Sequence, residues 1–259
     1  MARFQCNVIS YVLQRTVDIT VIVPSVTIPE ALGGEASPSH VLEERYPVLY
    51  LLHGMGNNHA TWCGYSNIEL YAEERNIAVV MISGENKCYR NVPGGDKFFD
   101  FIEKELPEFV TNYFPVSDKP EHSYIAGLSM GGYGSLLHGM SRPERFAAIG
   151  AFSAAVEISL NMDEEELKNR NLDIYYLTDK ALEEGKRIPP MYIACGEDDF
   201  LYEMNCKYKD ALTEKKVDVT WVSLPGYAHE WRFWDIQVEE FLKWIPRTDS
   251  YAAKGTRKV

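Results

Sequence analysis

The sequence contains no long hydrophobic segment. No run approaches the roughly 18 consecutive apolar residues that a membrane-spanning helix requires. The N-terminus has no long apolar stretch after Arg3, such as a secretory signal peptide would carry. We therefore expect neither a membrane anchor nor a signal peptide, no membrane partner, and a cytoplasmic location.

Cysteine is scarce, and its spacing is typical of neither disulfides nor metal ligands. The five cysteines are Cys6, Cys63, Cys88, Cys195 and Cys206. Their number is odd and no two of them form a Cys-x-x-Cys pair, so we expect neither a disulfide framework nor a zinc site. Reduced thiols in a cytoplasmic protein are the simpler interpretation.

Positive charge is in deficit. The chain has 26 Lys and Arg residues against 38 Asp and Glu residues, which gives a net charge of −12. An acidic surface repels the phosphates of nucleic acids and the headgroups of anionic lipids. We therefore expect no nucleic-acid partner and look instead for a small-molecule ligand.

The size and the composition are those of a folded globular protein. Apolar residues make up 46% and charged residues 25% of the 259 positions. A chain of this length can bury a large core without disulfides or metal. We expect a single domain over residues 1–259.

Segments with strand and helix patterns alternate along most of the chain. Strands are predicted at residues 4–13, 16–23, 47–53, 77–82, 123–126, 146–152, 190–195 and 217–224. Helices are predicted at residues 60–75, 96–114, 132–141, 201–214 and 231–245. This alternation implies right-handed crossovers and a mostly parallel sheet with helices on both faces.

Three segments depart from the alternation. Residues 24–45 are rich in proline and glycine and are predicted to be a loop. Residues 155–188 are predicted to form a small helical, cap-like insertion over the sheet edge. Their acidic run at 163–166 suits the start of a helix, where negative charge is stabilised, and a cation site is the alternative. The polar tail after Pro246 is expected to fray.

The segment Gly127-Leu-Ser129-Met-Gly131 matches the pattern Gly-x-Ser-x-Gly. It directly follows a short apolar strand and directly precedes a helix, which is the setting of the nucleophile elbow in the α/β-hydrolase fold. In such a turn the serine oxygen stands above the sheet edge. The residues two before and two after the serine must be small, because strand and helix nearly touch there. We therefore predict the α/β-hydrolase fold with Ser129 as nucleophile.

A serine nucleophile needs a base, and in this fold the acid and then the histidine follow the serine along the chain. Of the six histidines, only His138 and His229 follow Ser129. His138 lies on the helix just after the elbow, along a packing surface. His229 lies in the loop between the last strand and the last helix, where the base is expected. We therefore predict that His229 is the base.

The acid that orients the histidine should follow the seventh predicted strand. Three neighbouring carboxylates stand there, namely Glu197, Asp198 and Asp199. Their positions alone do not choose between the two aspartates. Asp173 and Asp179 lie in the insertion rather than at a strand end, and are weaker candidates.

An oxyanion hole needs two N–H donors. The residue after the nucleophile, Met130, supplies one of them in this fold. The other comes from the loop after the strand at 47–53, where Met55 is the expected donor. Gly54 and Gly56 would let that loop curl.

Two histidines lie in or near this loop. We expect His53 to hold the loop through hydrogen bonds. A metal role for His53 and His59 is not expected, because no carboxylate and no third histidine lies near them in the sequence. We therefore predict no metal site.

Four motifs together resemble the esterase D family of α/β-hydrolases. The resemblance is nearest to bacterial tributyrin esterases, with S-formylglutathione hydrolases, feruloyl esterases and acetyl xylan esterases as wider relatives, and it runs from about residue 4 to residue 245. The motifs are His53-Gly-Met55, Gly127-Leu-Ser-Met-Gly-Gly-Tyr133, Cys195-Gly-Glu-Asp-Asp-Phe-Leu-Tyr202 and Gly226-Tyr-Ala-His-Glu-Trp231.

The resemblance implies an acyl-ester hydrolase that needs no cofactor. In the family pattern the acid stands directly before Phe-Leu, which favours Asp199 over Asp198. The resemblance also places Trp62 near the substrate pocket, with a buried core aromatic as the alternative. We count Gly54 and Trp62 as candidate substrate-binding residues.

These residues predict a serine carboxylesterase that hydrolyses short-chain acyl esters, such as acetyl or butyryl esters, through an acyl-enzyme. A feruloyl or acetyl xylan esterase acting on plant cell-wall esters is the alternative within this class. An acyltransferase with the same triad is the alternative of another class. The expected partner is a small ester, and a homo-oligomer remains open.

Overall fold

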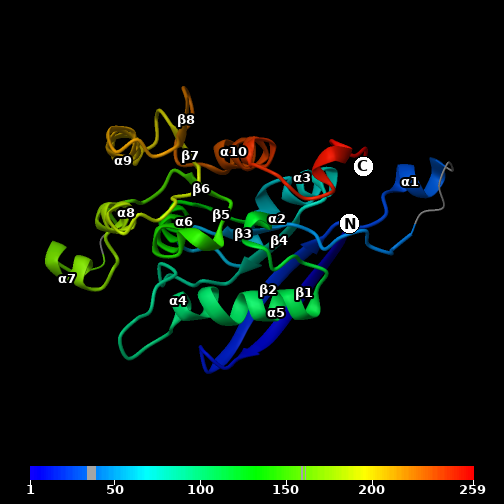
Figure 1. Ribbon diagram of the computed structural model, residues 1–259, viewed down its shortest axis with the longest axis horizontal. Helices are drawn as coiled ribbons and strands as arrows, with labels where there is room; N and C mark the ends of the chain where they lie inside the picture. The colour runs from blue at the N-terminus through cyan, green and yellow to red at the C-terminus, as the bar shows by residue number, and fades with distance from the viewer. Residues whose placement is uncertain (34–38, 159, 161) are drawn as a thin grey trace.

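The strands form one eight-stranded sheet that runs through the molecule (Figure 1). Figure 1 shows the computed structural model, which describes residues 1–33, 39–158, 160 and 162–259. Along the sheet the strands are β1 (Ala2–Ser10), β2 (Arg15–Val23), β4 (Ala78–Ile82), β3 (Val48–Leu52), β5 (Ser123–Leu128), β6 (Ala148–Phe152), β7 (Met191–Gly196) and β8 (Val219–Leu224). Strands β1 and β2 pair antiparallel, β2 pairs antiparallel with β4, and every further pair is parallel.

The central strands are buried on both faces. Every residue of β3, β4, β6 and β7 is buried, which explains their continuous apolar sequences. The edge strands differ: β1 is exposed or partly buried in all but its last residue, and β8 is partly buried throughout. The parallel strands β3, β5, β6, β7 and β8 therefore bring their carboxyl ends, and the loops that follow them, to one edge of the sheet.

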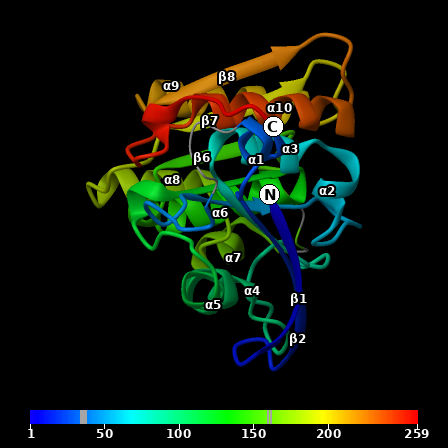
Figure 2. The ribbon, with the colours of Figure 1, turned by 90° about the vertical axis from the view of Figure 1, so that its right-hand side faces the viewer.

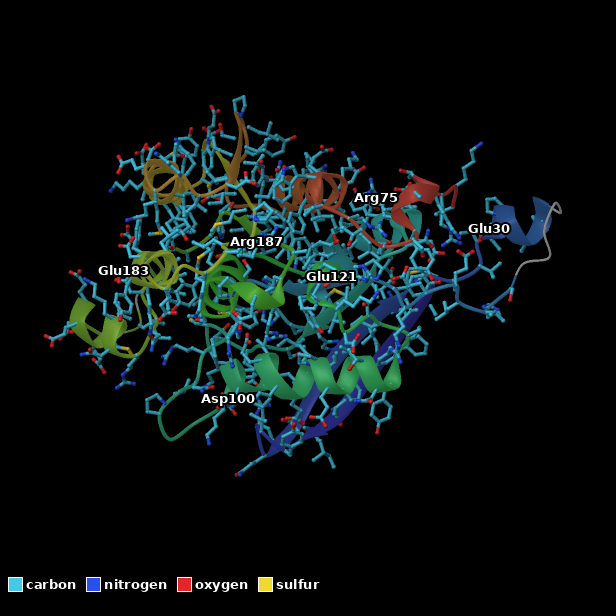
Figure 3. The ribbon with its side chains drawn as sticks, in the orientation of Figure 1. Glu30, Arg75, Asp100, Glu121, Glu183 and Arg187 are labelled. Atoms are coloured by element: carbon cyan, nitrogen blue, oxygen red, sulfur yellow. The ribbon has the colours of Figure 1, made fainter. Side chains whose placement is uncertain are left out.

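Helices cover both faces, and the two views agree on the layers (Figures 1 and 2). One face carries α2 (Thr61–Tyr65), α3 (Ile68–Arg75) and α10 (Trp231–Trp244). The other carries α4 (Phe98–Asp100), a π-helical turn (Phe101–Glu105), α5 (Leu106–Tyr113), α6 (Met130–Ser141), α8 (Ile174–Glu183) and α9 (Tyr202–Glu214). Side chains fill the space between helices and sheet (Figure 3) and form one apolar core on each face.

The remaining helical segments are short. They are α1 (Ile28–Gly33), α7 (Glu164–Asn169) and 3₁₀ turns at Pro120–His122, Pro143–Arg145 and Ala252–Lys254. Helix α1 falls inside the segment predicted as a loop at 24–45, of which residues 34–38 lie outside the described residues. Within the described ranges, no helix is both long enough and apolar enough to pass through a bilayer.

Two predicted helices are interrupted. The helix expected at 60–75 is divided into α2 and α3. Asn67 lies between them, and its backbone amide donates to the Asp235 carboxylate at 2.8 Å. The helix expected at 96–114 includes the π-helical turn before α5. Pro107 closely follows this π-helical turn, so the change in helix type falls where proline interrupts the hydrogen-bond ladder.

The insertion at 155–188 is helical, as predicted, and it begins at the sheet edge, where the Ala155 amide donates to the Ser129 carbonyl at 3.1 Å. Helix α8 packs beside α6 on one face of the sheet, and the Tyr133 hydroxyl of α6 donates to the Leu172 carbonyl at 2.8 Å. The acidic run begins α7 as predicted, since the Asp163 side chain accepts a hydrogen bond from the Glu166 amide at 2.8 Å. No group of metal-ligating side chains occurs in the described part of the chain, which includes the insertion except residues 159 and 161.

The tail after Pro246 is packed rather than frayed, contrary to the prediction. The Tyr251 ring is buried and stacks on Tyr46 at 4.9 Å. Further along, the Arg257 guanidinium pairs with Glu30 of α1 at 2.6 Å and donates to the Asn76 side chain at 2.7 Å. Sequence patterns do not predict this docking, because the partners lie about 180 to 230 positions upstream.

Candidate active site

Ser129 stands in a strained turn between β5 and α6. Its backbone has φ 52° and ψ −116°, in a region that a residue with a side chain rarely adopts. Neighbouring backbone holds this conformation: the Ser129 amide donates to the Phe152 carbonyl at 2.9 Å, and its own carbonyl accepts from the Tyr133 amide at 3.0 Å. This is the geometry that the Gly-x-Ser-x-Gly sequence predicts.

The two glycines of the motif leave room for the turn. A Cβ added at Gly127 would lie well inside 3.0 Å of the Gly131 backbone. A Cβ added at Gly131 would collide with the backbone carbonyls of Leu52 and His53, at the end of β3. Backbone atoms of a central strand cannot move aside as a flexible side chain can, so only glycine fits at both positions.

We expect Gly131→Ala to destabilise the protein by about 3 kcal/mol, because the new methyl group overpacks a rigid backbone contact. A loss of that size lowers Tm by about 6 °C or more in a chain of this length. Thermal unfolding followed by circular dichroism measures it. Gly64→Ala is the matched control, since a Cβ at Gly64 meets nothing within 4 Å. Equal Tm values for the two variants would contradict the steric argument.

His229 and Asp199 are brought together from two loops at the carboxyl edge of the sheet. The Nδ1 atom of His229 lies 2.9 Å from Oδ2 and 3.1 Å from Oδ1 of Asp199. When Nδ1 carries the ring proton, its N–H donates a hydrogen bond to this carboxylate. Nε2 is then unprotonated and can accept a proton from the nucleophile. Asp198, the other aspartate that the sequence left open, is exposed. The structure therefore pairs His229 with Asp199, as the family resemblance implied.

The Asp199 carboxylate is buried and well bonded. It accepts a hydrogen bond from the Leu201 amide at 2.9 Å as well as from His229. Burial alone would raise the pKa of Asp199, but these hydrogen bonds outweigh it and hold that pKa below its ordinary value. Asp199 is therefore ionised at neutral pH and can stabilise a positive charge on the His229 ring.

Three aromatic or hydroxyl side chains that the sequence analysis did not name as site residues support this pair. The Trp234 ring meets His229 edge-on at 4.8 Å, and the Phe200 ring lies against it at 4.7 Å. The Trp234 Nε1–H donates to the Ser153 hydroxyl at 3.1 Å, and Ser153 in turn helps to lower the pKa of Asp199. Of the three, only Phe200 could have been predicted from the sequence, because it directly follows the acid.

The loop after β3 lies against the nucleophile turn. A Cβ built on Gly54 would be 3.5 Å from the Ser129 Cβ. His53 holds this loop as predicted: its Nδ1–H donates to the Gly54 carbonyl at 2.7 Å, and its Nε2 accepts from the Gly84 amide at 2.9 Å. Burial lowers the pKa of His53, which favours this neutral form. His59 is also engaged, with its Nδ1 2.7 Å from the Thr20 hydroxyl.

The two candidate oxyanion donors flank Ser129. Met130 is the first residue of α6 and Met55 follows Gly54, and neither amide donates a hydrogen bond to another backbone group in the described part of the chain. The hydrogen bond between the nucleophile and the base is not formed in this structure. Among the described residues, the His229 ring is hydrogen-bonded to Asp199 and not to the Ser129 hydroxyl. Hydrogen bonds of this kind often tighten only when substrate is bound.

Two other sequence candidates belong to the core. Trp62 is completely buried and donates its Nε1–H to the Leu52 carbonyl at 3.1 Å, so it supports the floor below the site and cannot touch a substrate. The alternative interpretation, a core aromatic, is therefore the correct one for Trp62. His138 is fully buried between Glu103 and the Tyr89 carbonyl, at 2.5 Å and 3.0 Å, which rules it out as the base for Ser129.

Known proteins similar to this chain are hydrolases. A curated acetyl esterase of Caldicellulosiruptor saccharolyticus is 33% identical over 95% of this chain and 99% of its own length. Two solved structures from Staphylococcus aureus are each 30% identical over 94% of this chain. The fluorophosphonate-binding serine hydrolase FphF has a TM-score of 0.82 and 97% of its chain covered. The S-formylglutathione hydrolase FrmB has a TM-score of 0.80 and 98% covered.

The family comparison agrees with the fold and with these relatives. The model of the family described as Putative esterase matches residues 35–244, most of the chain. That stretch includes the strained serine turn, the paired aspartate and histidine, and the loop beside the serine. The chain belongs to the Putative esterase family and is a carboxylic ester hydrolase with the α/β-hydrolase fold.

Proposed function

We propose that this protein is a serine carboxylesterase that hydrolyses short-chain acyl esters, with Ser129 as nucleophile, His229 as base and Asp199 as the orienting acid. The observation that carries the proposal is the strained Ser129 turn at the same sheet edge as the partly buried His229 and its buried partner Asp199. A strained turn of this kind is maintained at a cost, and such strain is concentrated at functional sites.

In the proposed reaction the Ser129 Oγ attacks the carbonyl carbon of the ester while its proton passes to Nε2 of His229. The carbonyl oxygen becomes an oxyanion that accepts hydrogen bonds from the Met55 and Met130 amides. The intermediate collapses, the C–O bond to the alcohol breaks, and His229 returns the proton to the leaving oxygen. Water then attacks the acyl-serine by the same route, and the carboxylic acid is released.

The surroundings of the site favour a small, weakly polar substrate. Met55 and Phe200 are large apolar side chains that are 58% and 77% exposed, on the loops that carry the oxyanion amide and the acid. The His229 side chain is 20% exposed, which gives water access to the base for the second half of the reaction. The relative named acetyl esterase also favours a short acyl group.

We expect kcat/KM for p-nitrophenyl acetate and butyrate to exceed that for the octanoate by at least about tenfold. Initial rates at matched substrate concentrations measure this. Methyl ferulate serves as the aromatic comparison, and product analysis with added glycerol separates hydrolysis from acyl transfer. Faster cleavage of methyl ferulate than of the acetate would favour the feruloyl alternative. Glyceryl ester as the main product would favour an acyltransferase.

A further inference from the structure

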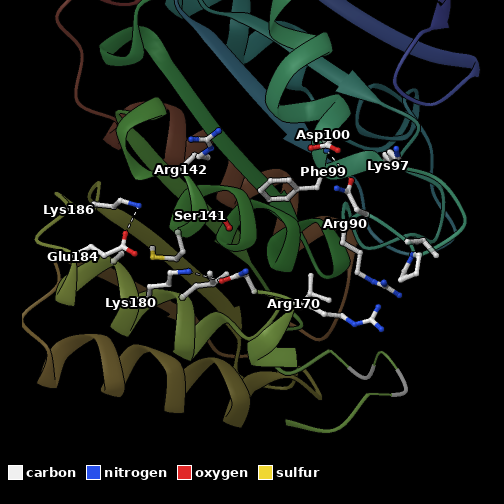
Figure 4. A pocket seen from close by; sticks show the side chains of 18 of the residues that line it. Arg90, Lys97, Phe99, Asp100, Ser141, Arg142, Arg170, Lys180, Glu184 and Lys186 are labelled. Atoms are coloured by element: carbon white, nitrogen blue, oxygen red, sulfur yellow. Dashed lines mark hydrogen bonds and ion pairs between the residues drawn. The ribbon is translucent and has the colours of Figure 1, made fainter. Parts of the chain in front are cut away.

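The largest concentration of positive charge in the described cavities lies away from the candidate triad. A cavity of about 800 Å³ opens between the loop at 90–97, the carboxyl end of α6, and the segment from α7 to α8 (Figure 4). None of Ser129, Asp199 and His229 lines it. Six basic side chains do, against the two carboxylates of Asp100 and Glu184. They are Arg90, Lys97, Arg142, Arg170, Lys180 and Lys186.

This concentration runs against the charge of the whole chain. The net charge is −12, so a surface chosen at random carries more carboxylates than basic groups. Like charges repel when they are gathered in one concave site, where the low-dielectric walls strengthen the field. An anion bound among the six basic groups would relieve that repulsion.

Not all of these basic groups have a carboxylate partner. Of the two lining carboxylates, Glu184 pairs with Lys186 at 2.7 Å. The other, Asp100, pairs at 3.1 Å with Lys104, which does not line the cavity. Lys180 donates to the amide oxygen of Asn171 at 3.0 Å instead of to a carboxylate. Figure 4 shows Lys180 and Lys186 on the same side of the cavity. Among the described residues, the ion-pair partners of Arg142 and Arg170 are exposed glutamates, and such surface pairs are weak.

Arg90 is the clearest sign of a missing acceptor. Its Nε and Nη1 atoms are buried, yet neither has a hydrogen-bond partner among the described residues. A buried donor without an acceptor is costly, more so when it is charged. The preceding residue fixes the backbone here, since the Tyr89 hydroxyl donates to the His53 carbonyl at 2.7 Å and the Tyr89 carbonyl accepts from His138 at 3.0 Å. Arg90 also lines the cavity, so its guanidinium charge is available to an anion bound there.

The cavity is also partly apolar. Phe99 lines it and is held in place by stacking on the His138 ring at 4.7 Å. Leu172, Leu177 and Met140 line it as well. A volume of this size is within the range of sites for small organic ligands, and the combination of basic groups with apolar walls suits a ligand with both characters.

We propose that this cavity is a binding site for a small organic anion that carries two or more negative charges, with Arg90 as its central contact. Phosphate esters and polycarboxylates share this chemistry. The site is separate from the ester-cleaving centre. It contacts Met140 and Ser141 at the end of α6, whereas Ser129 directly precedes the first residue of that helix. A helix of this length spans about 18 Å.

Isothermal titration calorimetry of the full chain with pyrophosphate, citrate and phenyl phosphate tests the site, at constant ionic strength set with sodium chloride. We expect saturable binding of at least one of these probes, and an increase in Tm with it. Arg90→Gln should weaken binding at least about tenfold, because the guanidinium charge in the cavity wall is lost. Arg232→Gln is the matched control, since Arg232 is exposed and lies on α10, on the other face of the sheet.

The probe that binds most tightly shows which chemical class of anion the cavity prefers. Tighter binding of pyrophosphate or phenyl phosphate than of citrate assigns the site to phosphates, and the reverse assigns it to polycarboxylates. The proposal is overturned if no probe binds the wild type at 5 mM (about the weakest affinity of interest), or if Arg90→Gln and Arg232→Gln bind equally. If Arg90→Gln fails to fold, Lys180→Gln replaces it. Lys180 lies on α8 and lines the cavity, and among the described residues its ammonium group donates a hydrogen bond to Asn171.

Discussion

Ser129→Ala should lower kcat for p-nitrophenyl acetate by at least a factor on the order of 10⁴, with a much smaller effect on KM. The alanine cannot form the acyl-enzyme, so only the oxyanion amides and substrate positioning remain to accelerate attack by water. A methyl group fits wherever the serine Cβ fits, so the variant should fold normally. A fluorophosphonate reagent, which the relative FphF binds according to its name, should label the wild type and not the variant.

Ser123→Ala is the control for this experiment. Ser123 begins β5, the strand at whose other end Ser129 stands, and its hydroxyl donates only to the Lys119 carbonyl at 3.2 Å. Activity within about twofold of the wild type is expected for Ser123→Ala, as for other substitutions of its kind. Full activity and undiminished labelling of Ser129→Ala would refute the assignment of the nucleophile.

Asp199→Asn should reduce kcat on the order of 10⁴-fold while leaving the protein folded. The asparagine keeps the shape of the side chain but removes the charge that stabilises a protonated His229 ring. Its amide can also donate toward Nδ1, which would place the ring proton on Nε2, the atom that must accept the proton of Ser129. Steady-state kinetics with p-nitrophenyl acetate measure the loss.

Asp198→Asn supplies the matched comparison, because it makes the same chemical change one residue away on an exposed side chain. Its kcat should stay within about threefold of the wild type, since exposed charges that lack a tight partner contribute little. If the two variants exchanged these outcomes, the acid would be Asp198 and the observed pairing with His229 would not be the functional one.

The nucleophile turn was predictable because its requirements are local. A strand, two glycines at fixed spacing and a helix are all visible in one short segment, and the backbone at Ser129 has the predicted strain. The choice between Asp198 and Asp199 was not local. Both follow the same strand, and the three-dimensional path of the Tyr227–Glu230 loop decides which one meets His229.

Other features depend on contacts between distant segments, which residue patterns do not reveal. Trp62 looked like a pocket residue by resemblance and is buried below Leu52. His138 pairs with Glu103, 35 positions earlier, and that carboxylate also binds Arg145 at 2.5 Å. Burial alone would raise the pKa of Glu103, but these two partners outweigh it and lower that pKa. Neither residue belongs to a motif that would predict such a buried ionic cluster.

The position of helix α8 has a similar origin. Its composition predicted a helix correctly, but not which surface the helix would cover. Side chains decide that: Ile174 and Leu177 are buried in the core shared with α6, and the Thr178 hydroxyl lies 3.1 Å from the Tyr208 hydroxyl of α9. The segment is therefore part of the helical layer on this face.

The docked tail affects where the folded unit can be cut. The family match ends at residue 244, yet Tyr251 fills a space beside Tyr46, and Arg257 neutralises carboxylates of α1 and α3. A shortened chain that stops at the family boundary would expose the Tyr46 ring and leave the buried Glu73 without the Arg257 cation. For expression and crystallisation, the folded unit therefore includes the residues up to Arg257 and does not stop at the end of its last long helix.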